Sequence, residues 1–254
     1  TMNIVACYKI VPDAQDIEVG ADGALRLDRA QWVLGEYDLV AIEAAAQLAA
    51  ATDGSAVLLS AGGEKLNDTK LVKAALSRGA DELYRVVDPA LEDADAFQTA
   101  SVLAAALRKI DFDLVVCGEG SADRYSQQVG LLVGALLGLP VVNATGSVRA
   151  EGDALLVERV LENEVEVLEI APPAVVSMTS DAVLPRIPQL KDILAAGKKP
   201  VTTWSLDEVG GIPESPVETV SVKAPASIAR KGIVLEGATD ENIGELVSGI
   251  RASR

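Results

Sequence analysis

Short apolar runs typical of buried β-strands alternate with longer runs at helical spacing along most of this sequence. The strand-like runs cover residues 3–8, 56–60, 82–87, 113–118 and 174–178. The helix-like runs cover residues 39–51, 64–78, 94–108 and 124–137. Alternation at this spacing indicates βαβ units, in which helices cover a parallel sheet. The sequence therefore predicts an α/β fold.

The pattern changes after Pro140. Three strand-like runs follow one another with short turns between them, at residues 141–149, 154–161 and 164–170. Consecutive strands joined by tight turns pair antiparallel. We therefore expect an antiparallel extension of the sheet.

Prolines become frequent after Leu184, and the strand–helix alternation is lost until a last helix at residues 240–252. We divide the chain into an α/β domain at residues 1–184 and an arm at residues 185–254. An arm of this length either docks on a partner subunit or is a tail that packs on itself or stays partly disordered.

Composition limits the partners that the chain can have. The chain has 254 residues, with 38 acidic and 22 basic side chains, so its formal net charge is −16. Binding to nucleic acid requires basic residues that displace phosphate counterions, so we expect no nucleic-acid partner. The most apolar stretch, residues 129–142, is too short to span a bilayer and is interrupted by Gly138 and Pro140. We expect a protein that is not embedded in a membrane.

The cysteines and the start of the sequence indicate a compartment. Cys7 and Cys117 each lie in a strand-like run, which does not suggest a disulfide framework. Met2 leads directly into a strand-like run, so no signal peptide is expected. Both observations predict a cytoplasmic protein.

Several catalytic motifs are missing. The sequence has no histidine, no P-loop, no G-x-G-x-x-G turn after the first strand, and no G-x-S-x-G elbow. Two separated cysteines cannot hold an iron–sulfur cluster alone. An enzyme that acts through its own side chains is therefore disfavoured, and we predict no catalytic residues and no metal site. Electron carriage remains, because a bound cofactor supplies that chemistry.

The strongest candidate for ligand binding is the stretch from Gly118 to Gly130, which follows one predicted strand and enters a predicted helix. Glycine at the carboxyl end of a strand lets a ligand approach the backbone, and a helix start offers unpaired N–H groups to a phosphate. Ser126, Gln127 and Gln128 add neutral hydrogen-bonding groups. Asp123 is also a candidate helix N-cap, and as a cap it would occupy those N–H groups itself.

Three weaker candidates lie where ligands of open α/β sheets bind, beyond the carboxyl ends of strands. They are the end of the first strand from Ala6 to Lys9, the turn Gly35-Glu36-Tyr37-Asp38, and the turn Ala61-Gly62-Gly63. Each turn alone is ordinary. Their convergence at one edge of the sheet favours a binding site.

A fifth segment, residues 185–199, contains a short predicted helix between Pro188 and Gly197. Ile187, Leu190 and Leu194 lie on one face at helical spacing. The segment holds four basic residues and one acidic residue, the reverse of the chain as a whole. It is either a helix packed on the body or a projection that binds a partner.

Taken together, these segments resemble the β subunit of electron-transfer flavoproteins, across nearly the whole chain. The resemblance is carried by residues 5–9, 41–45, 77–80, 118–130, 157–159, 173–176 and 185–199. The wording from Gly118 to Gly130 and from Pro185 to Lys191 is most similar to the Fix-type branch, which is linked to carnitine and acyl-CoA metabolism.

The resemblance implies a fold, cofactors and partners. The fold is a Rossmann-like, adenine-nucleotide-binding sheet. The partner is an α subunit that holds FAD near the interface, and the arm at residues 185–254 docks on it. The chain itself holds AMP or a second FAD, the latter in electron-bifurcating members. The pair carries electrons from an acyl-CoA dehydrogenase-type flavoenzyme to a quinone reductase or to a ferredoxin- or flavodoxin-type acceptor.

The resemblance also implies site residues. Those expected to contact the nucleotide are Ala6, Gly35, Glu36, Tyr37, Asp38, Ala61, Gly118, Glu119, Gly120, Ser121, Asp123, Arg124, Ser126, Gln127, Gln128 and Val129. Leu190 corresponds to the leucine that inserts into acyl-CoA dehydrogenases, with Ile187, Lys191, Ile193 and Leu194 around it.

The sequence departs from the family pattern at two places. Val160 occupies a position where many relatives carry a glutamate thought to pair with the α subunit, a contact that Glu158 or Glu162 would have to replace. Arg124-Tyr125-Ser126 differ from the residues that bifurcating relatives carry here, so the nucleotide bound by this chain is either AMP or FAD.

Two other classes of function compete with electron carriage. One is a stand-alone ATP- or AMP-binding sensor of the universal-stress type, which would not need the region after Leu184. The other is an adenylating enzyme, which would need a Ser- and Gly-rich loop after the first strand. Residues 8–12 do not provide such a loop.

Overall fold

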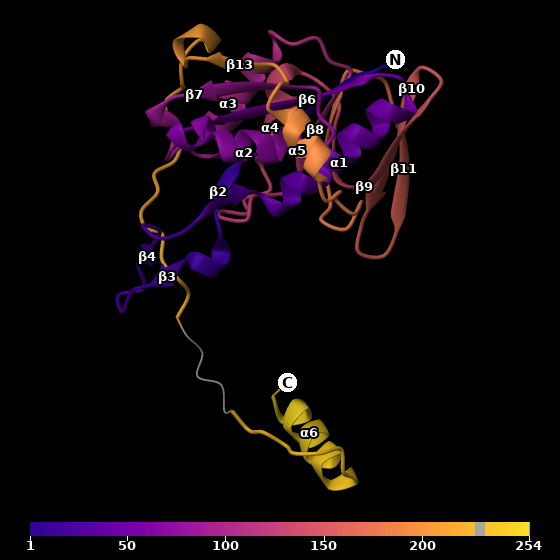
Figure 1. The fold of residues 1–254 in the computed structure, drawn as a ribbon. Coiled ribbons are helices and arrows are strands. Elements are labelled where there is room, and N and C mark those ends of the chain that lie inside the picture. The colour runs from indigo at the N-terminus through magenta and orange to yellow at the C-terminus, as the bar shows by residue number, and fades with distance from the viewer. Residues whose placement is uncertain (227–231, 254) are drawn as a thin grey trace. The chain divides into compact units, whose positions relative to one another are not determined.

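The computed structural model describes residues 1–226 and 232–253 (Figure 1). Its main element is a nine-stranded sheet with the order β11-β10-β9-β12-β8-β1-β6-β7-β13. The bounds are β1 Asn3–Cys7, β6 Ser55–Gly62, β7 Glu82–Val87, β8 Leu114–Gly118, β9 Val141–Glu151, β10 Ala154–Val160, β11 Val165–Ile170, β12 Ala174–Met178 and β13 Val201–Trp204. Neighbours from β9 through to β13 in this order are all parallel, which confirms the predicted α/β class.

The remaining elements are helices, short 3-10 turns and two small strand pairs. The helices are α1 Glu36–Ala51, α2 Thr69–Leu76, α3 Ala96–Leu107, α4 Val129–Leu137, α5 Leu190–Ala196 and α6 Asp240–Ala252. The 3-10 turns are η1 Ala14–Asp16, η2 Glu64–Asn67, η3 Pro89–Leu91 and η4 Asp207–Val209. The small pairs are β2 Ile10–Pro12 with β5 Trp32–Leu34, and β3 Glu18–Val19 with β4 Leu25–Arg26.

Two buried layers enclose the sheet, because side chains of a strand alternate between its faces. In β1, Ile4 and Ala6 pack in one layer with α1, α2 and Ala196 of α5. Val5 and Cys7 point to the other layer, which α3 and α4 complete. Strands that are covered on both faces consist of continuous apolar runs, and such runs could be recognised in the sequence.

The predicted antiparallel extension is also confirmed. β10 pairs antiparallel with β9 on one side and with β11 on the other. Gly152, with φ +61°, lies in the turn between β9 and β10, where a left-handed backbone favours glycine. The hairpin packs its inner face, including Leu155 and Val157, into the same layer as α1.

Two expectations about the elements were wrong. The predicted helix at residues 124–137 begins only at Val129, because Tyr125 and Gln127 have positive φ values that a helix cannot contain. The alternation also does not end at Leu184, since α5 is followed by β13, which pairs parallel with β7.

The chain forms two compact units. The first contains residues 1–18 and 26–221, so it extends past residue 184, where the sequence analysis divided the chain. The second contains residues 19–25 and the described part of the chain from Val222 onward. Within it, α6 has the bounds predicted from the sequence, and the Thr239 hydroxyl accepts a hydrogen bond from the Asn242 N–H at its start. Among the described residues, no helix combines the length and the apolar character needed to cross a membrane.

Candidate functional site

The carboxyl ends of β1 and β8 lie next to each other because the two strands are parallel neighbours. The first turn of α1 reaches this edge and inserts Asp38 between the two strand ends. One Asp38 carboxylate oxygen accepts a hydrogen bond of 2.7 Å from the Lys9 backbone N–H. Asp38 therefore joins two of the predicted binding segments, the end of β1 and the turn at residues 35–38.

Asp38 is buried, and burial raises its pKa to about 7. The backbone N–H groups of Lys9 and Gly118 and the Lys9 ammonium oppose that rise, while the Asp123 charge adds to it. A carboxyl group with a pKa near 7 changes charge in the physiological range. Perturbed groups of this kind are concentrated at functional sites.

Lys9 and Asp123 connect β1 to the loop after β8. The Lys9 Nζ lies 2.5 Å from a carboxylate oxygen of Asp123. Burial alone would raise the pKa of Asp123, but the hydrogen bonds from Lys9 and Ser121 and the Lys9 charge bring it below its usual value. The loop is thus fastened to the strand end by an ion pair that is partly shielded from solvent.

Two glycines in the loop permit close approach. A Cβ on Gly118 would lie 2.8 Å from the Asp38 carboxylate and 2.8 Å from the Tyr37 carbonyl carbon. A Cβ on Gly120 would lie 2.6 Å from the Tyr125 ring. Contacts this short would force the start of α1 or the tyrosine away. The glycines predicted from the motif are therefore required by the local packing.

Tyr125 folds back over its own loop. Its ring centroid lies 5.2 Å from that of Tyr37, in a tilted arrangement. The Tyr125 backbone has φ +44° and its N–H donates to the Ser121 carbonyl. Gln127 has φ +55°. Left-handed backbone at two non-glycine residues is uncommon and is concentrated at binding and active sites.

Helix α4 begins beside this loop without a side-chain cap. Gln128 is the N-cap residue, and its side chain makes no capping hydrogen bond. Asp123 does not cap the helix, because it precedes the helix start by several residues and pairs with Lys9. Uncapped N–H groups at a helix start interact favourably with an anion such as a phosphate.

A scan of known protein families gives an independent result. Residues 24–209, more than half of the chain, match the electron transfer flavoprotein domain. The chain belongs to the electron transfer flavoprotein family. Members of this family are flavin-associated electron carriers that work with other electron-transfer proteins. Membership does not favour the stand-alone sensor that the sequence analysis kept as an alternative.

The electron transfer flavoprotein fold brings most of the predicted site residues to one edge. Residues 35–38 and 118–123 meet around Lys9, and Arg124, Ser126, Gln127 and Gln128 continue the loop at the surface. Ala61 lies at the end of β6, next to β1. Ala6 is different, because it is paired on both sides within the sheet and is 1% exposed. Val129 is the first residue of α4.

Other groups at this edge were not among the predicted residues. The Ser177 hydroxyl donates to the Gly118 carbonyl (3.1 Å), and the Ser180 N–H donates to a Glu119 carboxylate oxygen (3.2 Å). Ser177 lies near the end of β12 and Ser180 follows it. They reach this edge because β12 is the neighbour of β8 in the sheet. By contrast, Tyr8 lies in the predicted segment from Ala6 to Lys9, and its hydroxyl is buried with no hydrogen-bond partner in the described part of the chain. Strand order cannot be read from local patterns, so no sequence signal pointed to Ser177 and Ser180.

The segment at residues 185–199, hereafter the docking segment, is packed on the body at one residue of its helix and exposed along its apolar side chains. Ala196 of α5 is buried against the body. Ile187, Leu190 and Leu194 are 90%, 72% and 66% exposed, with Ile193 and Lys191 exposed beside them. Exposed apolar side chains gathered on one short segment are typical of a protein–protein contact.

Proposed function

We propose that this chain is the β-type subunit of an electron-transfer flavoprotein of the Fix-type branch, and that it is a carrier without catalytic residues of its own. The observation that carries the proposal is the meeting of residues 35–38 and 118–123 at one edge of the sheet, beside the uncapped start of α4. This arrangement suits an adenine nucleotide.

The residues present fit such a nucleotide. Gly118 and Gly120 let the start of α1 and the Tyr125 ring pack against the loop, and the α4 N-terminus provides N–H groups for a phosphate. Tyr37 and Tyr125 offer aromatic surface, and Ser126, Gln127 and Gln128 offer neutral hydrogen bonds. AMP and the adenosine half of FAD share these groups, so either fits; a flavin would add reversible electron carriage.

We further propose that the chain works as a heterodimer with an α subunit that holds FAD at the interface. Helix α6 supports this. Its exposed apolar residues Ile243, Leu246, Val247 and Ile250 recur at helical spacing and form one stripe. A helix with such a stripe is stabilised by packing against another surface. The α subunit is the occupant that we assign to it.

The docking segment is the proposed contact with an acyl-CoA dehydrogenase-type flavoenzyme, with Leu190 inserting into it. Electrons would leave to a quinone reductase or to a ferredoxin- or flavodoxin-type acceptor, by a simple or a bifurcating route. We place the carrier in the cytoplasm, since Cys7 and Cys117 are free thiols.

Counting nucleotides tests the central assignment. The chain would be co-expressed with its α partner, the complex purified and denatured, and the released nucleotides identified per heterodimer. One FAD with one AMP supports a simple carrier, and two FAD support a bifurcating one. Failure to form a complex, with ATP retained by this chain alone, would contradict the proposal.

A further inference from the structure

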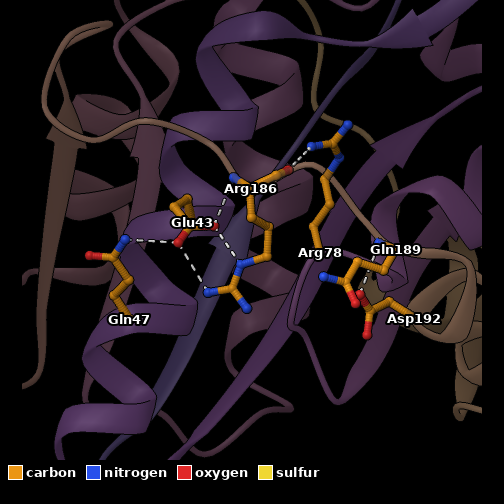
Figure 2. A network of polar contacts seen from close by, with 6 residues as sticks. All are labelled: Glu43, Gln47, Arg78, Arg186, Gln189 and Asp192. Carbon is orange, nitrogen blue, oxygen red and sulfur yellow. Dashed lines mark hydrogen bonds and ion pairs between the residues drawn. The ribbon is translucent and has the colours of Figure 1, made fainter.

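Contacts with the main body hold the docking segment at both of its ends, and Figure 2 shows those at its start. At the start, Arg186 contacts Glu43 of α1 and Arg78, which follows α2. At the end, the Lys199 ammonium donates to the carbonyls of Leu76 and Ala80, at 3.0 and 2.5 Å. We call Glu43, Leu76, Arg78, Gly79 and Ala80 the anchoring cluster.

Glu43 binds Arg186 through three hydrogen bonds. Its carboxylate accepts from the Arg186 Nε at 2.6 Å, from Nη2 at 3.0 Å and from the backbone N–H at 3.1 Å. Gln47 donates to the same carboxylate at 2.8 Å. Burial alone would raise the pKa of Glu43, but these hydrogen bonds and the Arg186 charge lower it. The carboxylate is therefore ionised at neutral pH, where charge-assisted bonds are strong.

The backbone of Arg186 is held on its other side as well. The Arg78 Nη1 donates to the Arg186 carbonyl at 2.7 Å. Gly79 has φ +102°, and a Cβ there would lie 2.7 Å from the Arg186 Nη1. The N–H and the carbonyl of Arg186 are thus held by two side chains, Glu43 of α1 and Arg78 in the turn after α2. The very next residue, Ile187, is 90% exposed.

The residues of the docking segment therefore fall into two groups, those that attach it to the body and those that stay exposed. Arg186 and Lys199 are engaged with the anchoring cluster, whereas Lys191 and Leu190 are exposed. Helix α5 is only seven residues long and would not hold its shape alone. Its side chains point outward in a defined arrangement because its two ends are held.

We propose that Glu43 and Arg78 are positioning residues that pre-organise the docking segment for its electron-transfer partner, without contacting that partner. This rests on the proposed role of the docking segment. A segment that is already ordered loses less conformational entropy on binding, so its affinity is higher. When Arg186 is no longer held, Leu190 is still present, but its side chain is no longer fixed in one orientation.

The test uses the purified heterodimer and an acyl-CoA dehydrogenase that reduces it, with Glu43→Gln as the main variant. Amide hydrogen exchange across residues 186–196 is expected to become at least tenfold faster. The KM for the heterodimer in its reduction by the dehydrogenase is expected to rise about tenfold, with kcat unchanged. Asp53→Asn is the matched control, because Asp53 follows the same helix, is exposed, and has φ +49°, which asparagine also adopts.

Arg78→Met is the second variant, in case Glu43→Gln fails to fold. Arg78→Met removes an Nε that is buried without a hydrogen-bond partner among the described residues, and it takes away the donor of the Arg186 carbonyl, which is the contact under test. The same rise in KM is expected. In a Leu190→Ala background, neither variant should raise KM further, since the side chain that they position is gone.

The outcomes separate the two proposals. If Leu190→Ala raises KM but Glu43→Gln and Arg78→Met do not, the positioning role is overturned and the docking role stands. If Leu190→Ala leaves KM unchanged, the docking role fails and the positioning role fails with it. Faster exchange with an unchanged KM would also overturn the proposal.

Discussion

The Asp38 carboxylate lies 2.7 Å from the backbone nitrogen of Lys9, a residue 29 positions earlier in the chain. This contact places an ionisable group between two strand ends, in a buried position. Its charge depends on pH near neutrality, so the stability of the fold depends on pH there as well.

The first prediction concerns Asp38→Asn and pH. Burial raises the pKa of Asp38 from 3.8 to about 7, so the folded state binds a proton more tightly than the unfolded state. The resulting stabilisation is present below about pH 4 and is lost as pH rises to about 7. The loss is on the order of 4 kcal/mol at most. The free energy of unfolding, measured with denaturant, should decrease from pH 5 to pH 8 in the wild type. The decrease should be smaller in Asp38→Asn, whose amide oxygen still accepts a hydrogen bond from the Lys9 N–H. Equal decreases would refute this role.

The second prediction concerns Gly118→Ala. The new Cβ would meet the Asp38 carboxylate and the Tyr37 backbone at 2.8 Å, so the first turn of α1 must shift. We expect nucleotide content to fall below half of the wild-type value while the sheet stays folded. Content is measured by denaturing the heterodimer and quantifying released nucleotide. The control is Gly244→Ala on α6, because a Cβ added there meets nothing within 4 Å. Gly138→Ala would be a poor control, because Gly138 has φ +69° and any side chain there is strained. Full nucleotide content in Gly118→Ala would contradict the assigned site.

The third prediction concerns the stripe on α6. Leu246→Lys places a charge in the middle of the apolar residues, and burial of that charge against the α subunit is unfavourable. The fraction of chain that co-purifies with the α subunit should fall at least tenfold. Glu245→Lys, next to it in sequence but outside the stripe, should co-purify normally. Equal behaviour of the two variants would argue against docking through this stripe.

The fourth prediction concerns the stability that Glu43 provides. Because the pKa of Glu43 is lowered in the folded state, its stabilisation is present above its unfolded value near 4.5 and is lost as pH falls through the folded value. Glu43→Gln should destabilise the protein by roughly 1–3 kcal/mol at pH 7.5. The difference from wild type should shrink at pH 4, as measured by denaturant unfolding at both values. A difference that is the same at both pH values would mean that the charge of Glu43 is not what stabilises the fold.

Regular elements with a clear apolar periodicity could be predicted from the sequence. The strands Glu82–Val87 and Ala174–Met178 and the helix Asp240–Ala252 have the predicted bounds, because their apolar periodicity is uninterrupted. β13 was missed because four residues with alternating burial carry too little periodicity. The late start of α4 was missed because residues 124–128 contain no glycine or proline to signal a break.

The candidate site was predictable only in part, for a related reason. Glycines at the end of β8 indicated the loop, since local chemistry explains them. The contacts of Lys9 with Asp123 and of Arg186 with Glu43 join residues separated by 114 and 143 positions. Such pairs are set by the order of strands and by the path of the chain over α1 and α2. No local pattern contains that information.

Arg186, held by Glu43 of α1, and Lys199, held at the end of α2, fix the position of the docking segment without using the residues between them that would contact a partner. Residues 187–195 can change in kind while Arg186 and Lys199 stay attached to the same carboxylate and carbonyls and Ala196 stays buried. Partner preference can then diverge between relatives without any change in the hydrophobic core. A graft of residues 187–195 from one carrier into another should transfer the choice of dehydrogenase along with it.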